Sequence, residues 1–112
     1  MDIGGAQAAV NAWIEKIGGG YFSELTNMVL LTEEVGELAR VVARMYGDQV
    51  AKPGDLDSDP RANLSEEMAD VLWVLLCLAN QTGVDMTKAF EATLEKKTRR
   101  DSKRFCELGV RN

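Results

Sequence analysis

The sequence predicts an all-α protein, a chain of four helices that forms a helical bundle completed by dimerisation. In four separate stretches, apolar residues recur every three or four positions, which is the spacing of one face of a helix. Glycine, proline and aspartate residues separate these stretches, and none shows the alternation of a half-buried strand. With 112 residues, we expect positions 1–112 to form a single domain with its own core.

The first two helices are bounded by clear end signals. The first is expected over residues 3–17 and ends at the three glycines that follow it. Ser23 is a candidate N-cap for the second helix, which is expected over residues 24–46, with Gly47 just beyond its end. This second helix is the longest of the four.

A polar loop over about residues 48–62 is expected next, and it is long for so small a domain. The segment 63–66 has the pattern of a capping box that opens the third helix, which we expect to reach about Gln81. A connection of some fifteen residues lets the chain run back along the bundle. The second and third helices can then lie antiparallel with their acidic residues level.

The fourth helix is expected to begin after Gly83, which ends the third helix, and after Asp85, which is a candidate N-cap. It extends to about Phe105. Its last turns, over residues 96–105, carry 6 of the 13 Lys and Arg residues of the chain.

Two acidic clusters interrupt stretches that otherwise indicate buried helix faces. They comprise Glu33, Glu34 and Glu37 in the second helix and Glu66, Glu67 and Asp70 in the third. Four of these residues share a stripe with Leu, Val or Met side chains, namely Glu34, Glu37, Glu67 and Asp70. Carboxylates rarely enter an apolar stripe unless something pairs with them, and they repel one another.

A divalent cation that bridges the two clusters resolves this conflict most simply. An all-oxygen ligand set selects Mg²⁺ or Mn²⁺. The chain contains no histidine, which argues against a di-iron bundle with its Glu-x-x-His pattern. Two other interpretations remain. Glu33 and Glu66 lie off the stripes and fit solvated positions equally well, and Arg40 or Arg44 offers salt bridges, although two arginines cannot neutralise so many acids.

Charge is distributed unevenly along the chain. Residues 1–95 carry 6 Lys/Arg against 16 Asp/Glu, whereas residues 96–112 carry 7 against 2. The acidic body argues against binding of duplex nucleic acid, and the basic tail suits a small polyanion. Lys96, Arg100 and Arg104 recur at helical spacing and form one positive face. The alternative is an exposed helix end whose cations complement the helix dipole.

A few further residues are candidates for contact with a nucleoside. Trp13 is a candidate for base stacking, whereas Trp73 lies among apolar neighbours and is expected to pack in the core. Asn27 either binds a base or sugar or pairs with backbone. Cys77 is expected to be a small core residue.

The sequence indicates a cytoplasmic protein. Residues 1–5 do not resemble a secretory signal, and acidic residues interrupt every apolar run before it reaches the length of a membrane span. Two cysteines do not make a disulfide framework.

The ordered set of acids resembles a known family. Glu33-Glu34-x-x-Glu37 followed by Glu67-x-x-Asp70 is similar to the EExxE…ExxD motif of MazG-type nucleotide pyrophosphohydrolases, in the all-α NTP pyrophosphatase superfamily. The resemblance covers nearly the whole chain, includes the closing Lys96-x-x-x-Arg100-Asp101-x-x-Arg104-Phe105, and fits the compact single-domain branch. It implies Mg²⁺-dependent hydrolysis of a (deoxy)nucleoside triphosphate to the monophosphate and pyrophosphate.

The resemblance and the residues together give a set of expected roles. Glu34, Glu37, Glu67 and Asp70 match the metal ligands of the family, with Mg²⁺ as the cofactor and Mn²⁺ as a substitute. Glu33 or Glu37 is expected to act as the catalytic base that positions water. Lys96, Arg100 and Arg104 are expected to hold the phosphates, and Asn27 and Trp13 to contact the nucleoside.

Apolar residues on more than one face of the second and third helices indicate a homodimer, or a tetramer built from two dimers. Two alternative functions remain at this stage. One is a non-catalytic helical module that binds a nucleotide, a metal or another protein. The other is a narrower enzyme of the same superfamily, such as a dUTPase-like or phosphoribosyl-ATP hydrolase.

Overall fold

A computed structural model describes residues 1–48, 53 and 59–107. It contains four α-helices: α1 (Ile3–Lys16), α2 (Glu24–Tyr46), α3 (Pro60–Thr82) and α4 (Met86–Glu107). The described residues contain no strand, which confirms the all-α class. None of these four helices is both long and apolar enough to cross a membrane. Most of the expected loop lies outside the described residues.

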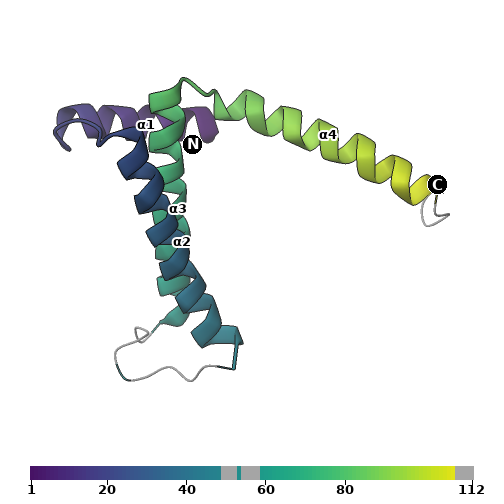
Figure 1. Ribbon diagram of the computed structural model, residues 1–112, viewed down its shortest axis with the longest axis horizontal. Helices are drawn as coiled ribbons and strands as arrows, with labels where there is room; N and C mark the ends of the chain where they lie inside the picture. Colours follow the sequence, from purple (N-terminus) through teal and green to yellow (C-terminus); the bar gives the residue numbers. More distant parts are fainter. Residues whose placement is uncertain (49–52, 54–58, 108–112) are drawn as a thin grey trace.

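Helices α2 and α3 run antiparallel, side by side, and form the most extensive packing in the chain (Figure 1). Helix α1 crosses one end of this pair and packs against α3, and α4 leaves from the same end and packs against α1. The far half of α4 points away from α2 and α3 (Figure 1). The radius of gyration is therefore 18.2 Å, whereas a compact chain of this length has about 13 Å.

Most helix ends follow the expected capping chemistry. The Ser23 side chain accepts a hydrogen bond from the Thr26 amide at 3.2 Å, which opens α2 as predicted. Asp85 does the same for the Lys88 amide at 3.1 Å and opens α4. Gly83 ends α3 with a φ of +72°, a left-handed conformation that favours glycine.

The beginning of α3 differs from the prediction. The helix starts at Pro60, because the Asp59 side chain accepts hydrogen bonds from the amides of Arg61 at 3.2 Å and Ala62 at 3.3 Å. Proline at the first helical position has its φ angle preset for a helix and needs no amide partner there. The capping box expected over 63–66 is therefore wrong: Ser65 lies inside the helix, and its hydroxyl donates to the Arg61 carbonyl at 3.0 Å.

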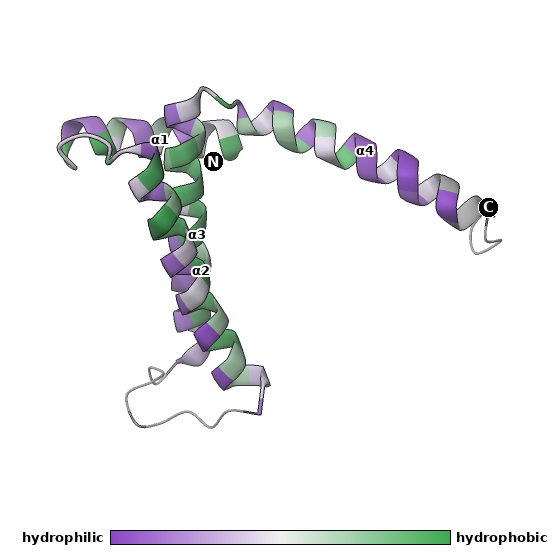
Figure 2. Cartoon of the chain, viewed as in Figure 1, coloured by the Kyte–Doolittle hydropathy of each residue, from purple (hydrophilic) through white to green (hydrophobic). Residues whose placement is uncertain are grey.

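The buried core is small and lies where α1 meets α3. Val10, Leu76 and Cys77 form its centre, as expected for Cys77, and Tyr21 and Met86 pack against it. Many other large apolar side chains stay exposed, including Val29, Val35, Val42, Leu72, Leu75, Phe90 and Leu94. Figure 2 shows apolar residues along α1, α2 and α3 and mostly hydrophilic residues along the far half of α4.

Gln7 fixes the direction in which α4 leaves the body. Its side-chain amide donates to the Val84 carbonyl at 2.9 Å, and its carbonyl oxygen accepts from the Met86 amide at 2.9 Å. Asn80 on α3 donates to the Gln7 backbone carbonyl at 3.0 Å. One side chain of α1 therefore holds both the end of the α3–α4 connection and the first turn of α4. No local pattern in the sequence signals this role, because 77 positions separate Gln7 from Val84.

Candidate functional site

Three carboxylates converge between α2 and α3. Glu34 comes from α2, and Glu67 and Asp70 come from α3, where a spacing of three residues puts them on one face. One oxygen atom from each of the three lies within 4.8 Å of the others. The antiparallel pairing of the two helices brings the two acidic clusters level, as the long connection predicted (Figure 1).

Two oxygen atoms in this group are covered by protein without a hydrogen-bond partner. They are Oε2 of Glu34 and Oε2 of Glu67, and no donor among the described residues reaches either. A buried polar atom that makes no hydrogen bond destabilises the folded state, and a buried charge does so more strongly. Such atoms are the ones that a bound cation would satisfy.

The group is also electrostatically unfavourable by itself. Burial raises the pKa of Glu34, and the negative charges of Glu37, Asp70 and Glu67 raise it further. Burial likewise raises the pKa of Glu67, followed by the charges of Glu37, Asp70 and Glu66. The site therefore favours either a proton or a cation over the free carboxylates. Its donors are all carboxylate oxygens, which fit Mg²⁺ or Mn²⁺.

The remaining acids of the two clusters lie around this group. Glu37 is exposed, and its negative charge contributes to the raised pKa of both Glu34 and Glu67, so it lies near the three carboxylates. Glu33 and Glu66 are exposed, as their positions off the apolar stripes indicated. The structure thus brings together three of the four residues expected as metal ligands, Glu34, Glu67 and Asp70, and leaves Glu37 and Glu33 outside this three-carboxylate group.

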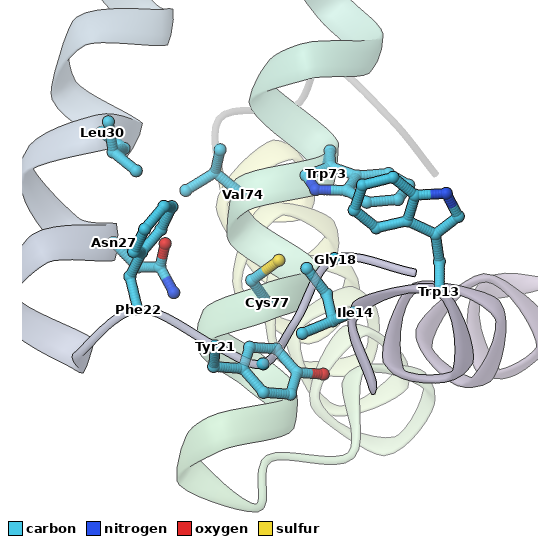
Figure 3. A pocket seen from close by; sticks show the side chains of 11 residues that line it. Trp13, Ile14, Gly18, Tyr21, Phe22, Asn27, Leu30, Trp73, Val74 and Cys77 are labelled. Atoms are coloured by element: carbon cyan, nitrogen blue, oxygen red, sulfur yellow. The ribbon is translucent and has the colours of Figure 1, made fainter. Parts of the chain in front are cut away.

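A cavity of about 300 Å³ lies beside the acids, toward the α1 end of the helix pair. Trp13, Tyr21 and Phe22 line it together with Trp73 and Cys77 from α3 (Figure 3). On α2 it is lined by Asn27 and Leu30, and Leu30 precedes Glu34 by one helical turn, about 6 Å along the axis. The cavity lining is mostly apolar and contains none of the acids; Leu30 on α2 and Trp73 on α3 lie about one helical turn from Glu34 and Asp70.

Two tryptophans form one side of this cavity. The rings of Trp13 and Trp73 meet edge to face, with their centroids 5.3 Å apart (Figure 3). Trp13 is 43% exposed and lines the cavity, so its ring is accessible as the stacking hypothesis requires.

The expectation that Trp73 packs in the core is wrong: it is 38% exposed. The reason is that α3 leaves this face uncovered except where the Trp13 ring meets it. Gly18 allows that arrangement, because a Cβ atom there would approach the Trp13 ring to 2.8 Å.

Asn27 is buried on the α2 side of the cavity. Its side-chain nitrogen donates to Oε1 of Gln81 at 2.8 Å, and the Gln81 nitrogen donates to the Phe22 carbonyl at 2.5 Å. Asn27 therefore pairs with a side chain and not with backbone. Gln81 lies 54 positions from Asn27 and belongs to no motif, so no local pattern in the sequence predicts its role.

The basic residues of α4 do not join the acids within one chain. Lys96, Arg100 and Arg104 are all exposed on the part of α4 that points away from the body (Figure 1). Asp101 lies 3.3 Å from Arg100 and 4.0 Å from Arg104 and neutralises part of their charge. Ion pairs this exposed are weak and exchange readily for a stronger anion.

Comparison with known proteins identifies relatives along most of the chain. A model of the MazG nucleotide pyrophosphohydrolase domain matches residues 22–105. The uncharacterized protein YpjD of Bacillus subtilis is 40% identical over 99 residues, which cover 88% of this chain and 86% of YpjD. A crystal structure of YpjD matches with a TM-score of 0.71 over 86% of this chain and 92% of that one. A Bacillus-conserved MazG protein, a nucleotide pyrophosphohydrolase, matches with 35% identity and a TM-score of 0.70, over 86% and 88% of the two chains.

The raised pKa values of the carboxylate group predict how the stability of the protein depends on pH. The pKa values of Glu34 and Glu67 are raised in the folded state above their ordinary value of 4.5, so the unfolded chain loses these protons first as pH rises. Their contribution to stability is complete below 4.5 and is lost as pH rises through the folded pKa values. In the presence of EDTA, the melting temperature should therefore rise as the pH falls from 7.5 toward about 5.

The matched variant is Glu67→Gln, which keeps the shape of the side chain and removes one charge. Its melting temperature in EDTA should be higher than that of the wild type at pH 7.5, and the difference should shrink toward pH 5. An exposed control, Glu91→Gln on α4, should show neither effect. A pH-independent difference between Glu67→Gln and wild type would contradict the proposed repulsion.

Proposed function

The chain belongs to the family of MazG nucleotide pyrophosphohydrolases, which are hydrolases, and on that basis we propose that it converts a (deoxy)nucleoside triphosphate and water to the monophosphate and pyrophosphate, with Mg²⁺ as cofactor. The observation that carries this proposal is the convergence of Glu34, Glu67 and Asp70, with two buried unpartnered oxygens, beside a cavity large enough for a nucleobase.

Glu34, Glu67 and Asp70 would hold the metal, with Glu37 as a fourth ligand at the open side. Their carboxylates supply the negative charge that attracts a divalent cation, and their fixed positions on two long helices set where it binds. Mg²⁺ bound there supplies Lewis-acid polarisation of the phosphoryl oxygens. A cation held by these residues would offset the burial and the mutual repulsion that raise the pKa values of Glu34 and Glu67.

Glu37 is the strongest candidate for the base that positions the attacking water. Its charge acts on both Glu34 and Glu67, and its side chain is exposed, so a water molecule reaches it from solvent. In the reaction, the water oxygen bonds to phosphorus and the bond from that phosphorus to the α–β bridging oxygen breaks. The electron pair of that bond leaves with pyrophosphate when water attacks the α-phosphorus, and with the monophosphate when water attacks the β-phosphorus. The water proton passes to a carboxylate. Glu33 lies farther from the three carboxylates and is the second candidate for the base.

The adjoining cavity would hold the nucleoside. Trp13 exposes part of its ring there and offers a surface for base stacking, and Asn27 offers a polar contact. The uncovered apolar lining suits the flat face of a base better than it suits water. The acids lie one turn farther along α2 than Leu30, so the phosphates reach them while the base stays in the cavity.

A second copy of the chain would supply the cations for the phosphates, in a homodimer or a dimer of dimers. Within one chain the basic part of α4 points away from the acids (Figure 1). Phe90 and Leu94 on α4 are 55% and 57% exposed, and Leu72 on α3 is 50% exposed. Exposed apolar residues of this kind favour burial in an interface, and the acidic part of one chain would attract the basic part of α4 of another. Lys96, Arg100 and Arg104 of each copy would then face the acids of the other.

The metal proposal predicts a stability change. Adding Mg²⁺ or Mn²⁺ should raise the melting temperature, because the ion binds the folded state. At a free ion concentration of a hundred times the dissociation constant, the free energy of unfolding increases by about 2.7 kcal/mol. Glu37→Gln should keep the helical circular dichroism spectrum and lose nearly all nucleotide hydrolysis. Calorimetric titration that detects no divalent binding, with or without nucleotide, would refute the proposal.

The reaction proposal predicts the products. Intact pyrophosphate should be released, and hydrolysis in ¹⁸O-labelled water should label the monophosphate or the pyrophosphate but never free orthophosphate. Arg100→Ala should raise KM for the triphosphate by about 10- to 100-fold, the loss of one charge-assisted hydrogen bond, and leave metal affinity unchanged. Arg99→Ala is the matched control and should change KM little. Orthophosphate as the first product would exclude this reaction.

The assembly proposal predicts complementation between two defective chains. Glu67→Gln removes an acid and Arg100→Ala removes a cation, so each homodimer should be nearly inactive at low substrate concentration. A mixed dimer, isolated through two different affinity tags, should recover about half of the wild-type activity, because one of its two sites receives both intact residues. A mixed dimer as inactive as its parents would show that acid and cation act from the same chain.

A further inference from the structure

Asn27 presents an unpartnered acceptor to the cavity. The residue is only 4% exposed, yet it lines the cavity (Figure 3). Its nitrogen atom is engaged by Gln81 at 2.8 Å, and no donor among the described residues reaches its oxygen atom, Oδ1. Oδ1 is not among the fully covered unpartnered atoms of the described residues, so it is open to the cavity and is well placed to accept a hydrogen bond from a ligand.

The orientation of this amide is fixed by a short chain of hydrogen bonds. The Phe22 backbone carbonyl can only accept, so the nitrogen atom of the Gln81 side chain must face it. The oxygen atom of Gln81 then faces Asn27 and must receive a donor, which the Asn27 nitrogen supplies. The flip that is possible for an isolated asparagine is thereby excluded, and Oδ1 is turned away from Gln81.

The position of Asn27 relative to the acids determines which part of a nucleotide it meets. Asn27 precedes Glu34 by seven residues, about 10.5 Å along α2, and Leu30 lies between them on the cavity wall. A nucleotide whose phosphates reach the acids therefore points its base toward Asn27. The group on the base that lies farthest from the sugar is the one at C4 of a pyrimidine or C6 of a purine.

We propose that Asn27, held in place by Gln81, selects nucleobases with an amino group at this far edge, cytosine and adenine, over uracil, thymine and guanine. This inference rests on the proposed function only for the placement of the phosphates at the acids. Cytosine and adenine carry an NH₂ donor at that position, whereas uracil, thymine and guanine carry a carbonyl oxygen. A carbonyl facing Oδ1 would leave two buried acceptors opposed and unpaired.

Binding of nucleoside monophosphates tests the inference without any requirement for catalysis. Calorimetry with Mg²⁺ present should give dCMP a dissociation constant about 10- to 100-fold lower than dUMP, and dAMP a similar advantage over dGMP, the usual effect of one unpaired buried polar group. If the triphosphates are hydrolysed, their kcat/KM values should follow the same order.

Two variants separate the role of Asn27 from general binding. Gln81→Ala frees the Asn27 amide to flip and offer its nitrogen atom, so the dCMP/dUMP preference should fall to within about twofold. Asn27→Leu should remove the preference through loss of the acceptor. Thr82→Ala is the matched control: that hydroxyl donates to the Leu78 carbonyl of its own helix at 2.7 Å, and the preference should be unchanged.

The outcomes distinguish this inference from the proposed reaction. Equal affinity for dCMP and dUMP in the wild type, a preference for dUMP, or no binding of any monophosphate would overturn the inference. A preference that survives Gln81→Ala would overturn the role of the Gln81 bond, even if Asn27→Leu fails to fold. Wild type that prefers dCMP but hydrolyses no triphosphate would refute the reaction and leave the base site standing.

Discussion

The repulsion among the acids held between α2 and α3 is the constraint on which the rest of the structure depends. Glu34, Glu67 and Asp70 approach within 4.8 Å, and two of their oxygens are covered without a partner. Flexible elements would move such charges apart, whereas two helices of 23 residues each hold them together. The length of α2 and α3 is therefore tied to the site, because apolar packing on both sides of the acids must outweigh their repulsion.

The end of the α2–α3 pair near α1 is built differently from the part that holds the acids. Toward α1, the helix pair opens into the apolar cavity lined by Trp13 and Trp73. Polar side chains rather than a large apolar core shape this end: Gln7 fixes the start of α4, and Gln81 links Asn27 on α2 to the Phe22 carbonyl. Directional hydrogen bonds define relative positions more narrowly than apolar contacts do. The end of the molecule that contains the proposed nucleoside cavity is thus held by hydrogen bonds with fixed geometry.

The sequence predicts what depends on local rules. Helical periodicity located the helices and put Glu34, Glu67 and Asp70 on facing stripes, and cap residues such as Ser23 and Gly83 marked true ends. The start of α3 was placed too late because two adjacent capping patterns compete there, and the Asp59 cap with Pro60 at the first position is the stronger. The Gln81 and Gln7 contacts span 54 to 79 positions and leave no local pattern, and the exposure of Trp73 depends on which faces α1 leaves uncovered.

The shape of the chain links folding to the completeness of the site. The buried core of one chain is small, Phe90 and Leu94 on α4 have no cover within it, and the radius of gyration of 18.2 Å is that of an open molecule. Association that buries the exposed apolar faces would supply the stabilisation that an isolated chain lacks. Because the acids lie on α2 and α3 and the cations on α4, the same association would bring opposite charges together. Under the proposed assembly, the chain would gain stability and the cations proposed to bind phosphate in a single step, and an unassembled copy would hold the acids without the means to position a triphosphate.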